Sequence, residues 1–148
     1  MKLKFFTPAE WGTVATKVHA AVFGAGLPEN FQRIDFAIVA EDDEKLVGYM
    51  TGVEINSELL RFGFGGCVPG FQNTLRVVKA YSMALEWAKK GPWLSAITII
   101  KNDNLPSLKL ALAHGFRVIG VQYFEGDVLL ELQLKLKDVR PNAELRSA

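Results

Sequence analysis

The first group of residues whose types and spacing could do chemistry lies where a long helix, 71–90, is predicted to begin. Asn73 and Thr74 offer hydrogen-bond donors there, and Arg76 adds one positive charge. A helix N-terminus favours negative charge, because its first amides have no partner within the helix. This stretch could therefore bind an anion. Taken alone, Arg76 is more often a solvated helix residue, and that alternative stays open.

The second group lies in the stretch KNDNLPSLKLALAHGF, residues 101–116. Asn104 can cap a short helix over about 105–114, and Gly115 can end it in the left-handed conformation. The leucines between them recur at helical spacing and would face a core. The segment is either purely structural, or a helix whose Asn104 or Ser107 also contacts a cofactor.

Other groups that could move protons or hold a metal are scattered. Glu54 and Glu58 flank a predicted strand turn and could line a cleft, although solvated turn carboxylates are commoner. His19 is predicted on the rim of the first helix, far in sequence from His114. No cysteine, histidine or carboxylate cluster has the spacing of metal ligands, so no metal site is expected.

Composition excludes several classes of protein. The 148 residues fit one domain, with 49% hydrophobic and 22% charged residues and a formal net charge of +1. A nucleic-acid partner is disfavoured, because such proteins usually carry a basic excess. The single cysteine, Cys67, forms no internal disulfide and indicates a reducing compartment. It is interpreted as a small buried residue rather than a nucleophile.

No apolar run reaches the ~18 residues of a membrane span. The start, MKLKFFTPAEW, breaks at Thr-Pro before a signal-like region develops. We therefore expect a cytoplasmic protein with no membrane partner. The domain is predicted to span 1–137, followed by a flexible polar tail over 138–148.

The elements that must position these residues follow from periodicity and turn signals. A helix is predicted from the Thr7 cap, with its capping-box partner Glu10, to about Gly24. A loop follows over 24–33, with a helical turn after Pro28. The predicted strands are 2–6, 36–41, 46–55, 58–68, 94–100, 116–124 and 128–136. This order predicts one α/β or α+β domain, a mixed sheet of about seven strands flanked by helices.

Two of these elements carry further expectations. The strand over 58–68 is glycine-rich toward its end, which often marks a bulge or the close approach of a ligand. The helix over 71–90 has an apolar stripe that is expected to face the core. Its members are Leu75, Val78, Tyr81, Leu85 and Ala88.

This order of elements resembles the GNAT acetyltransferase superfamily over nearly the whole chain. Many members carry Asn-x-x-Ala-x-x-Leu-Tyr-x-x-x-Gly-Phe after the fifth strand. Here Asn104 is followed at matching offsets by Ser107, Leu110, Gly115 and Phe116. The resemblance implies an N-acetyltransferase that moves an acetyl group from acetyl-CoA to an amine on a small molecule or peptide.

The resemblance also implies where acetyl-CoA would lie, in the splay between the fourth and fifth strands. Backbone groups of 66–68 would hold the pantetheine arm, and the turn over 72–76 would meet the pyrophosphate. The implied cofactor-binding residues are Gly66, Cys67, Val68, Gln72, Asn73, Thr74, Leu75, Arg76, Asn104 and Ser107.

The sequence departs from the family pattern at both motifs. In the pyrophosphate turn, Gln/Arg-x-x-Gly-x-Gly/Ala, Gln72 fits, but Leu75 and Val77 replace the small residues. They would crowd a phosphate unless their side chains turn into the core. At the position of the tyrosine that protonates the departing thiolate, this chain has Ala111.

No other residue clearly replaces the missing acid. His114 is interpreted as a helix-end residue, and Tyr81 and Tyr123 as core aromatics with a polar tip. The catalytic residues therefore stay unassigned.

These departures keep a second hypothesis open, a non-catalytic GNAT-fold protein. The segments 62–90 and 101–116 also resemble phage-encoded GNAT-like proteins. This resemblance implies a phage or prophage protein acting in head assembly or within the virion. Such a binding protein could fill the splay with Phe64, Leu75 or Phe116. The apolar, glycine-rich fourth strand and an exposed region around Trp93 could contact virion proteins. The fold also allows a homodimer through a C-terminal strand.

Overall fold

The computed structural model describes residues 1–25 and 33–138. Its strands are β1 (Lys2–Phe6), β2 (Phe36–Asp42), β3 (Lys45–Glu54), β4 (Leu59–Cys67), β5 (Ser95–Lys101), β6 (Arg117–Phe124) and β7 (Asp127–Lys135). Its helices are α1 (Pro8–Phe23), α2 (Leu75–Lys90) and α3 (Leu105–Ala113), with a 3₁₀ turn η1 (Pro69–Phe71) before α2. The predicted order of elements is confirmed. The turn after Pro28 and the tail from residue 139 lie outside the described residues.

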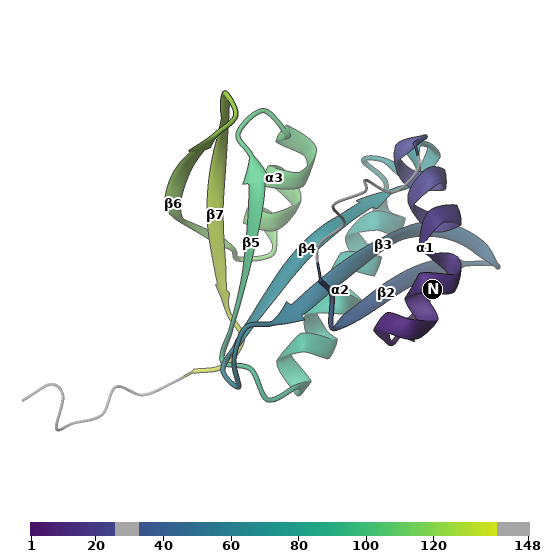
Figure 1. The fold of residues 1–148 in the computed structure, drawn as a ribbon, viewed down its shortest axis with the longest axis horizontal. Coiled ribbons are helices and arrows are strands. Elements are labelled where there is room, and N and C mark those ends of the chain that lie inside the picture. The colour runs from purple at the N-terminus through teal and green to yellow at the C-terminus, as the bar shows by residue number, and fades with distance from the viewer. Residues whose placement is uncertain (26–32, 139–148) are drawn as a thin grey trace, which may run out of the picture.

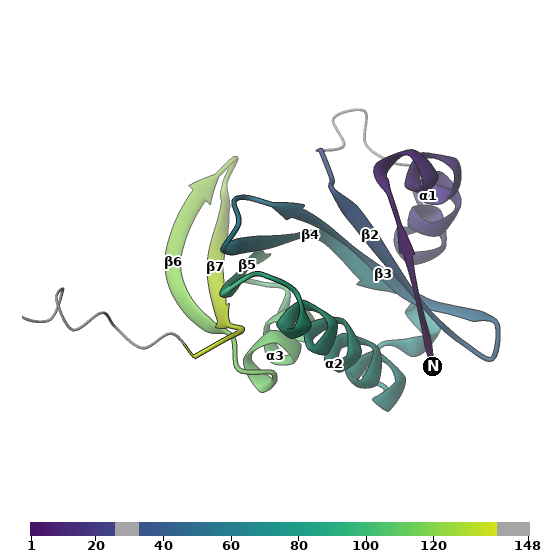
Figure 2. The ribbon, with the colours of Figure 1, turned by 90° about the horizontal axis from the view of Figure 1, so that it is seen from below.

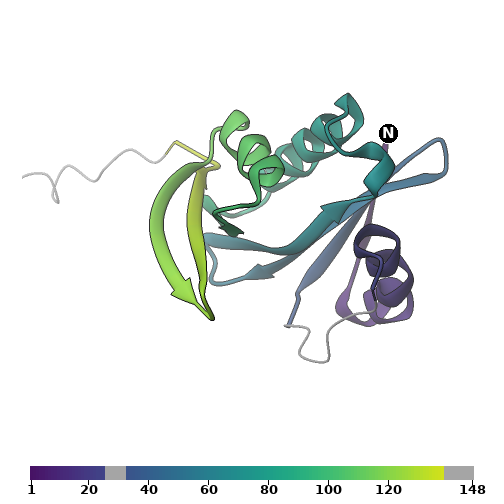
Figure 3. The same ribbon diagram turned by 90° about the horizontal axis from the view of Figure 1, so that it is seen from above.

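The seven strands form one sheet in the order β1-β2-β3-β4-β5-β7-β6. Only β4 and β5 run parallel, and every other neighbouring pair is antiparallel. Figure 1 shows β1 to β4 on one side of this parallel junction and β5 to β7 on the other. Figures 2 and 3 show α1 on one face of the sheet and α2 with α3 on the opposite face.

Local sequence signals place the first helix. Thr7 accepts a hydrogen bond from the Glu10 amide at 3.3 Å, and the Glu10 carboxylate accepts one from the Thr7 amide at 3.0 Å. This reciprocal pair is the predicted capping box. Gly24 ends the helix with φ of 70°, a conformation that glycine adopts without steric cost.

Two hydrophobic cores form on the two faces of the sheet. The larger packs α2 and α3 against β4, β5 and β7, and it includes Leu60, Leu85, Ala111 and Leu132. The smaller packs α1 against β2 and β3 around Trp11 and Tyr49.

The start of α2 differs from the prediction. The helix begins at Leu75 instead of residue 71, because η1 and Asn73, with φ of 58°, interrupt the backbone. Its predicted stripe is only partly buried. Leu85 and Ala88 lie in the core, whereas Leu75 is 86% and Val78 42% exposed. The first turns of α2 therefore lie outside the core that its later turns join.

Trp93 is also not where it was expected. It is 8% exposed and packs against Phe36 and Trp87. The expectation of an exposed contact region around Trp93 is wrong, because the chain folds this ring onto the aromatic end of the larger core. Within the described ranges, no helix is long and apolar enough to cross a membrane.

Candidate functional site

The main irregularity of the sheet is the point where β4 and β5 separate. They pair over only four positions, from Leu59 with Ser95 to Phe62 with Thr98. Beyond these positions β4 continues to Cys67 and β5 to Lys101 without pairing with each other, and Figure 1 shows the two strands diverging. The facing edges 63–67 and 99–101 therefore carry backbone groups that this ladder does not use.

A β-bulge lies at the same level. Two residues of β4, Gly63 and Phe64, stand opposite the single residue Thr51 of β3. The Thr51 hydroxyl donates a hydrogen bond to the Phe64 carbonyl oxygen at 3.0 Å, and Thr51 is 2% exposed. A bulge disrupts the ladder and redirects the backbone. The interpretation of the glycine-rich segment as a bulge is confirmed.

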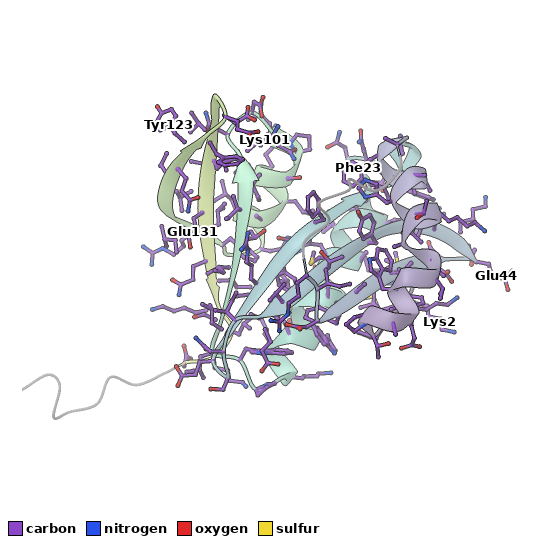
Figure 4. The ribbon with its side chains drawn as sticks, in the orientation of Figure 1. Lys2, Phe23, Glu44, Lys101, Tyr123 and Glu131 are labelled. Atoms are coloured by element: carbon purple, nitrogen blue, oxygen red, sulfur yellow. The ribbon has the colours of Figure 1, made fainter. Side chains whose placement is uncertain are left out.

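Close packing surrounds the glycines that follow the bulge. A Cβ at Gly66 would lie 2.8 Å from Cγ1 of Val22 and 3.0 Å from Cζ of Phe23, both in α1. Figure 4 shows Phe23 near the end of α1 that borders the diverging part of β4. Only glycine fits at position 66 without moving these side chains, so α1 supports this part of β4 from one face.

The turn that leads into α2 leaves the helix start without a side-chain cap. The Thr74 hydroxyl donates to the Phe71 carbonyl oxygen at 2.6 Å, and it makes no cap hydrogen bond to the helix. The amides of Leu75, Arg76 and Val77 open the helix and have no partner within it. A 16-residue helix thus presents its positive end beside the end of β4.

Arg76 is held beside this helix start. Its Nε lies 3.1 Å from an oxygen of Asp42, and its guanidinium carbon lies 5.3 Å from the centroid of the Phe71 ring. Its side chain is 49% exposed. The Asp42 carboxylate offsets part of the positive charge available for an anion. Arg76 is therefore partnered, not simply solvated.

The two residues that break the family pattern behave differently. Leu75 is 86% exposed and Val77 is half-buried. Leu75 does not turn into the core, because it occupies the first helical position, outside the core described above. Its side chain also does not fill the gap between β4 and β5. Phe116 is 2% exposed inside the larger core, and Phe64 is 41% exposed.

Asn104 caps α3 as expected, since its side-chain oxygen accepts a hydrogen bond from the Ser107 amide at 3.4 Å. Ala111 of α3 is completely buried, on the face of the helix that packs into the larger core. No proton donor exists at that position, and the packed core leaves no room there for a tyrosine ring.

The structure places the remaining aromatic and histidine candidates in different environments. His114 uses both ring nitrogens, with Nδ1 2.8 Å from the Leu110 carbonyl oxygen and Nε2 2.8 Å from the Ser82 hydroxyl. The bond to Ser82 joins α2 to the end of α3, and the bond to Leu110 lies within α3, so both support a structural role. Tyr81 packs in the larger core, where burial raises the pKa of its phenol. Tyr123 is 81% exposed, so its expected place in the core is wrong, because β6 forms the sheet edge.

His19 was expected on a helix rim, and this is also wrong. It is 5% exposed, and its Nδ1 lies 2.5 Å from the hydroxyl of Tyr49, which is 5% exposed. Phe23 and Trp11 also contact this pair of rings. Burial raises the pKa of Tyr49. The signal that could have located the pair is helical spacing, because His19 lies four residues after Ala15, which is buried on the same face.

The candidate carboxylates do not converge on the point of separation. Glu54 ends β3, and its amide donates to Asp35 at 2.7 Å. Glu58 lines an open depression of about 440 Å³ at the start of β4 and β5, four residues before Phe62. Glu131, which sequence reasoning did not select, opposes Ile99 in the ladder, but its carboxylate lies over Gly120 of β6.

Cys67 ends β4 and is half-buried, less covered than expected. Burial raises the pKa of its thiol, which keeps the sulfur protonated at neutral pH. Within the described ranges, no three histidine, cysteine, aspartate or glutamate side chains gather as metal ligands would.

The sequence matches no family model and no curated protein. Its structure, however, is similar to many solved acetyltransferases. The ribosomal-protein-S18-alanine N-acetyltransferase from Escherichia coli superposes on this chain with a TM-score of 0.74 at 10% sequence identity. The match covers 95% of this chain and 97% of that one. An IAA acetyltransferase from Bacillus cereus gives 0.73 at 15% identity, covering 90% and 98%.

A third neighbour, a candidate acetyltransferase from Salmonella typhimurium, was solved with its cofactor acetyl-CoA. It gives a TM-score of 0.69 at 18% identity, covering 97% of this chain and 98% of that one. The chain has the GNAT acetyltransferase fold. The predicted single-domain architecture and the resemblance in fold are thereby confirmed.

Proposed function

We propose that this protein is an N-acyltransferase that takes an acetyl group from acetyl-CoA and transfers it to an amine. The observation that carries the proposal is the separation of β4 from β5. A bulge lies where the two strands part, and the uncapped start of α2 lies beyond the end of β4. An extended ligand with amide groups and a terminal phosphate fits such a row of features. The GNAT fold and a neighbour solved with acetyl-CoA support this assignment.

Each part of the cofactor would meet a different part of the chain. The amides of the pantetheine arm would pair with the free edge of β4 near Gly66 and Cys67, as an added strand does. Val68 was expected to take part, but its amide donates to the Val47 carbonyl oxygen and its carbonyl oxygen accepts from the Phe71 amide. The pyrophosphate would lie at the turn over 72–76, where the first amides of α2 and Arg76 supply hydrogen bonds and positive charge. Asn104 and Ser107 would border the arm from α3.

The chemistry would be direct attack of the amine on the thioester carbonyl carbon. A carbon–nitrogen bond forms, the carbon–sulfur bond breaks, and the amine loses one proton as the CoA thiolate leaves. The backbone at the bulge lies at the level where the strands part, so an amide there could stabilise the developing oxyanion. Holding the two substrates together supplies much of the rate, even with Ala111 in place of an acid.

The class of the amine acceptor is bounded by the balanced charge of the chain. The sequence has a formal net charge of +1 and no acidic or basic constellation that would select a highly charged acceptor. We therefore propose a small-molecule or peptide amine. Among the neighbours, the Escherichia coli enzyme is described by its action on an alanine of a ribosomal protein.

The alternative is a non-catalytic GNAT-fold protein, with a role in a phage particle as one version. The observation that favours it is the combination of Leu75 at the helix start with Ala111 in the core. Against it, Leu75 is 86% exposed and therefore does not pack into the sheet. Both hypotheses concern the same site, so one binding measurement separates them.

The deciding experiment is calorimetric titration of the full chain with acetyl-CoA and with CoA. Micromolar dissociation constants for both ligands are expected. Release of CoA thiol in the presence of a panel of amines would then measure transfer. Absence of both heat and a thermal shift at millimolar ligand would overturn the proposal and favour the non-catalytic alternative.

A further inference from the structure

One face of the sheet beside the point of separation has no described helix over it. Leu60 and Phe62 of β4 point into the larger core, under α2 and α3. Side chains alternate along a strand, so Arg61 between them points to the opposite face. On that face α1 packs against β2 and β3, and Figures 2 and 3 show it away from β5, β7 and β6. We call this uncovered part, from Arg61 across β5 to β7, the open face.

The register of the ladder identifies the side chains of the open face. Residues that stand directly opposite each other point to the same side of a sheet. Arg61 is opposite Ile97 of β5, and Ile97 is opposite Gln133 of β7. Two residues further along β5, where β4 has already parted from it, Ile99 is opposite Glu131. Ile97 and Ile99 thus form an apolar floor between Arg61 and Glu131.

Arg61 and Glu131 are both half-buried, and neither side chain has a partner among the described residues. The ion pairs of the described ranges all involve other side chains. Their backbones are about two strand spacings apart, roughly 10 Å, so the two charges do not pair with each other. Partly buried charges usually have a partner, because losing water without one costs free energy. Two such charges of opposite sign indicate a ligand that carries both.

The surroundings leave both charges available. A Cβ at Gly120 would lie 3.4 Å from a carboxylate oxygen of Glu131, so β6 places no side chain over this carboxylate. The other cations that share this face are engaged or lie farther from the point of separation. Lys101 pairs with Asp127 at 3.2 Å. Arg117 is exposed on the outermost strand, β6.

The open face is also hollowed. The depression of about 440 Å³ at the start of β4 and β5 is lined by Leu59, Ser95 and Gln133. Leu59 and Ser95 are opposite each other, two residues before Arg61 and Ile97, so they belong to the same face. The depression therefore borders the row that contains Arg61. A small molecule bound over the apolar floor has room on this side.

We propose that the amine acceptor is a free amino acid, with its carboxylate on Arg61 and its ammonium group on Glu131 before the amine is deprotonated. This inference rests on the proposed function. The larger core fills the helix side of the sheet, so the acceptor reaches the thioester from the open face. A guanidinium matches a carboxylate with two parallel hydrogen bonds. Glu131 lies at the level where the strands have parted, so it holds the amine beside the thioester.

The proposal narrows the acceptor class in two ways. A peptide amine has no free carboxylate next to it, so a free amino acid is preferred over a protein N-terminus. Ile97 and Ile99 favour an apolar side chain, because they offer no polar group to bind. L-Leucine is therefore the probe, and L-leucinamide is its partner, with the same amine and side chain but no carboxylate.

The experiment measures release of CoA thiol from acetyl-CoA with each acceptor. The wild type should have a kcat/KM at least about ten-fold higher for leucine than for leucinamide, since a charge-assisted pair with Arg61 is lost in the amide. Arg61→Gln should raise the KM for leucine by about ten-fold and leave leucinamide within about two-fold. Arg61→Lys should recover part of the preference, because it restores the charge without the planar fork.

Glu131→Gln should lower kcat/KM about ten-fold for both acceptors, because both carry the amine. The control is Arg117→Gln, which removes a positive charge from the same side of the sheet but on the outermost strand. It should leave the preference for leucine unchanged. Calorimetry should give wild-type affinity for acetyl-CoA in all four variants, and circular dichroism establishes that each is folded.

The outcomes separate this inference from the proposed function. Equal kcat/KM values for leucine and leucinamide overturn the inference, and so does an Arg61→Gln variant that keeps the preference; thiol release with any amine still supports the transferase. Absence of thiol release with leucine overturns the inference as well. Absence of acetyl-CoA binding overturns both.

Discussion

Thr51 donates its hydroxyl hydrogen to the carbonyl oxygen of Phe64, across the bulge at the level where β4 leaves β5. This bond connects the interior of β3 to the first part of β4 that has no β5 partner. Because Thr51 is 2% exposed, the bond is shielded from water and fixes the backbone of the bulge.

Replacing Thr51 by valine keeps the shape of the side chain and removes this donor. We expect Thr51→Val to lower the free energy of unfolding by about 1 kcal/mol and to weaken acetyl-CoA binding several-fold. Urea unfolding and calorimetry measure the two effects. Thr16→Val, at an exposed position of α1, should change neither. Identical behaviour of the two variants would contradict a role for the bond.

A methyl group at position 66 should destabilise the folded protein. Gly66→Ala places a Cβ within 2.8 Å of Val22 and 3.0 Å of Phe23, so we expect a loss of about 1–3 kcal/mol of stability. Gly12→Ala is the control, because nothing lies within 4 Å of its Cβ and alanine favours a helix. Thermal melting should show the two shifts in opposite directions. If Gly66→Ala melts with the wild type, the close approach of α1 to β4 is not rigid.

Restoring a tyrosine at position 111 should not restore an acid. Ala111 is completely buried, and the ring would overpack the core, so Ala111→Tyr should lose more than about 3 kcal/mol. Ala113→Tyr, at an exposed position two residues later, should be nearly neutral. Chemical denaturation compares them. A stable Ala111→Tyr variant with faster thiol release would show that the site can accept the missing tyrosine.

Leu75 allows the family pattern to be restored at little structural cost. It is 86% exposed, so Leu75→Gly should cost less than about 1 kcal/mol. Removing its side chain from the helix start should tighten acetyl-CoA binding by about three- to ten-fold, because the phosphate can approach the amides. Val78→Gly carries a similar helix penalty, without clearing the turn. Equal affinities in calorimetry for Leu75→Gly and the wild type would place the pyrophosphate elsewhere.

The Cys67 thiol should titrate above its ordinary range, because burial raises its pKa. The folded state then holds the proton more tightly than the unfolded state does. The contribution of this group to stability is fully present below the pKa of the unfolded thiol and is lost as pH rises from there through the raised pKa of the folded thiol. Iodoacetamide alkylation against pH measures this, with the urea-unfolded chain as control. A folded protein that alkylates as fast as the unfolded one at pH 8 would contradict the shift.

Local signals predicted the fold well. The Thr7 capping box, the glycine at position 24 and the Glu125–Gly126 turn each determine a boundary through contacts within a few residues. The bulge was also predictable, because glycines concentrate where β4 departs from a regular ladder. These features depend on backbone conformation, which nearby residues set.

Features that depend on distant partners were not predictable. The pairing of Arg76 with Asp42 joins a helix start to a hairpin that lies more than thirty residues earlier. The burial of His19 depends on Tyr49, which β3 supplies. The exposure of Leu75 follows from where α2 begins, and η1 delays that start. In each case periodicity described the element correctly but did not reveal what would pack against it.

The unpaired edges between β4 and β5 have a consequence for solubility. A strand edge that faces solvent can capture another protein chain, which is the usual route to aggregation. Here two edges with unused hydrogen-bonding groups lie inside the sheet, flanked by paired strands on both sides. Because they are not outer edges, another folded protein cannot extend the sheet from them by adding a strand. Under the proposed function, the same backbone groups would pair with an extended ligand.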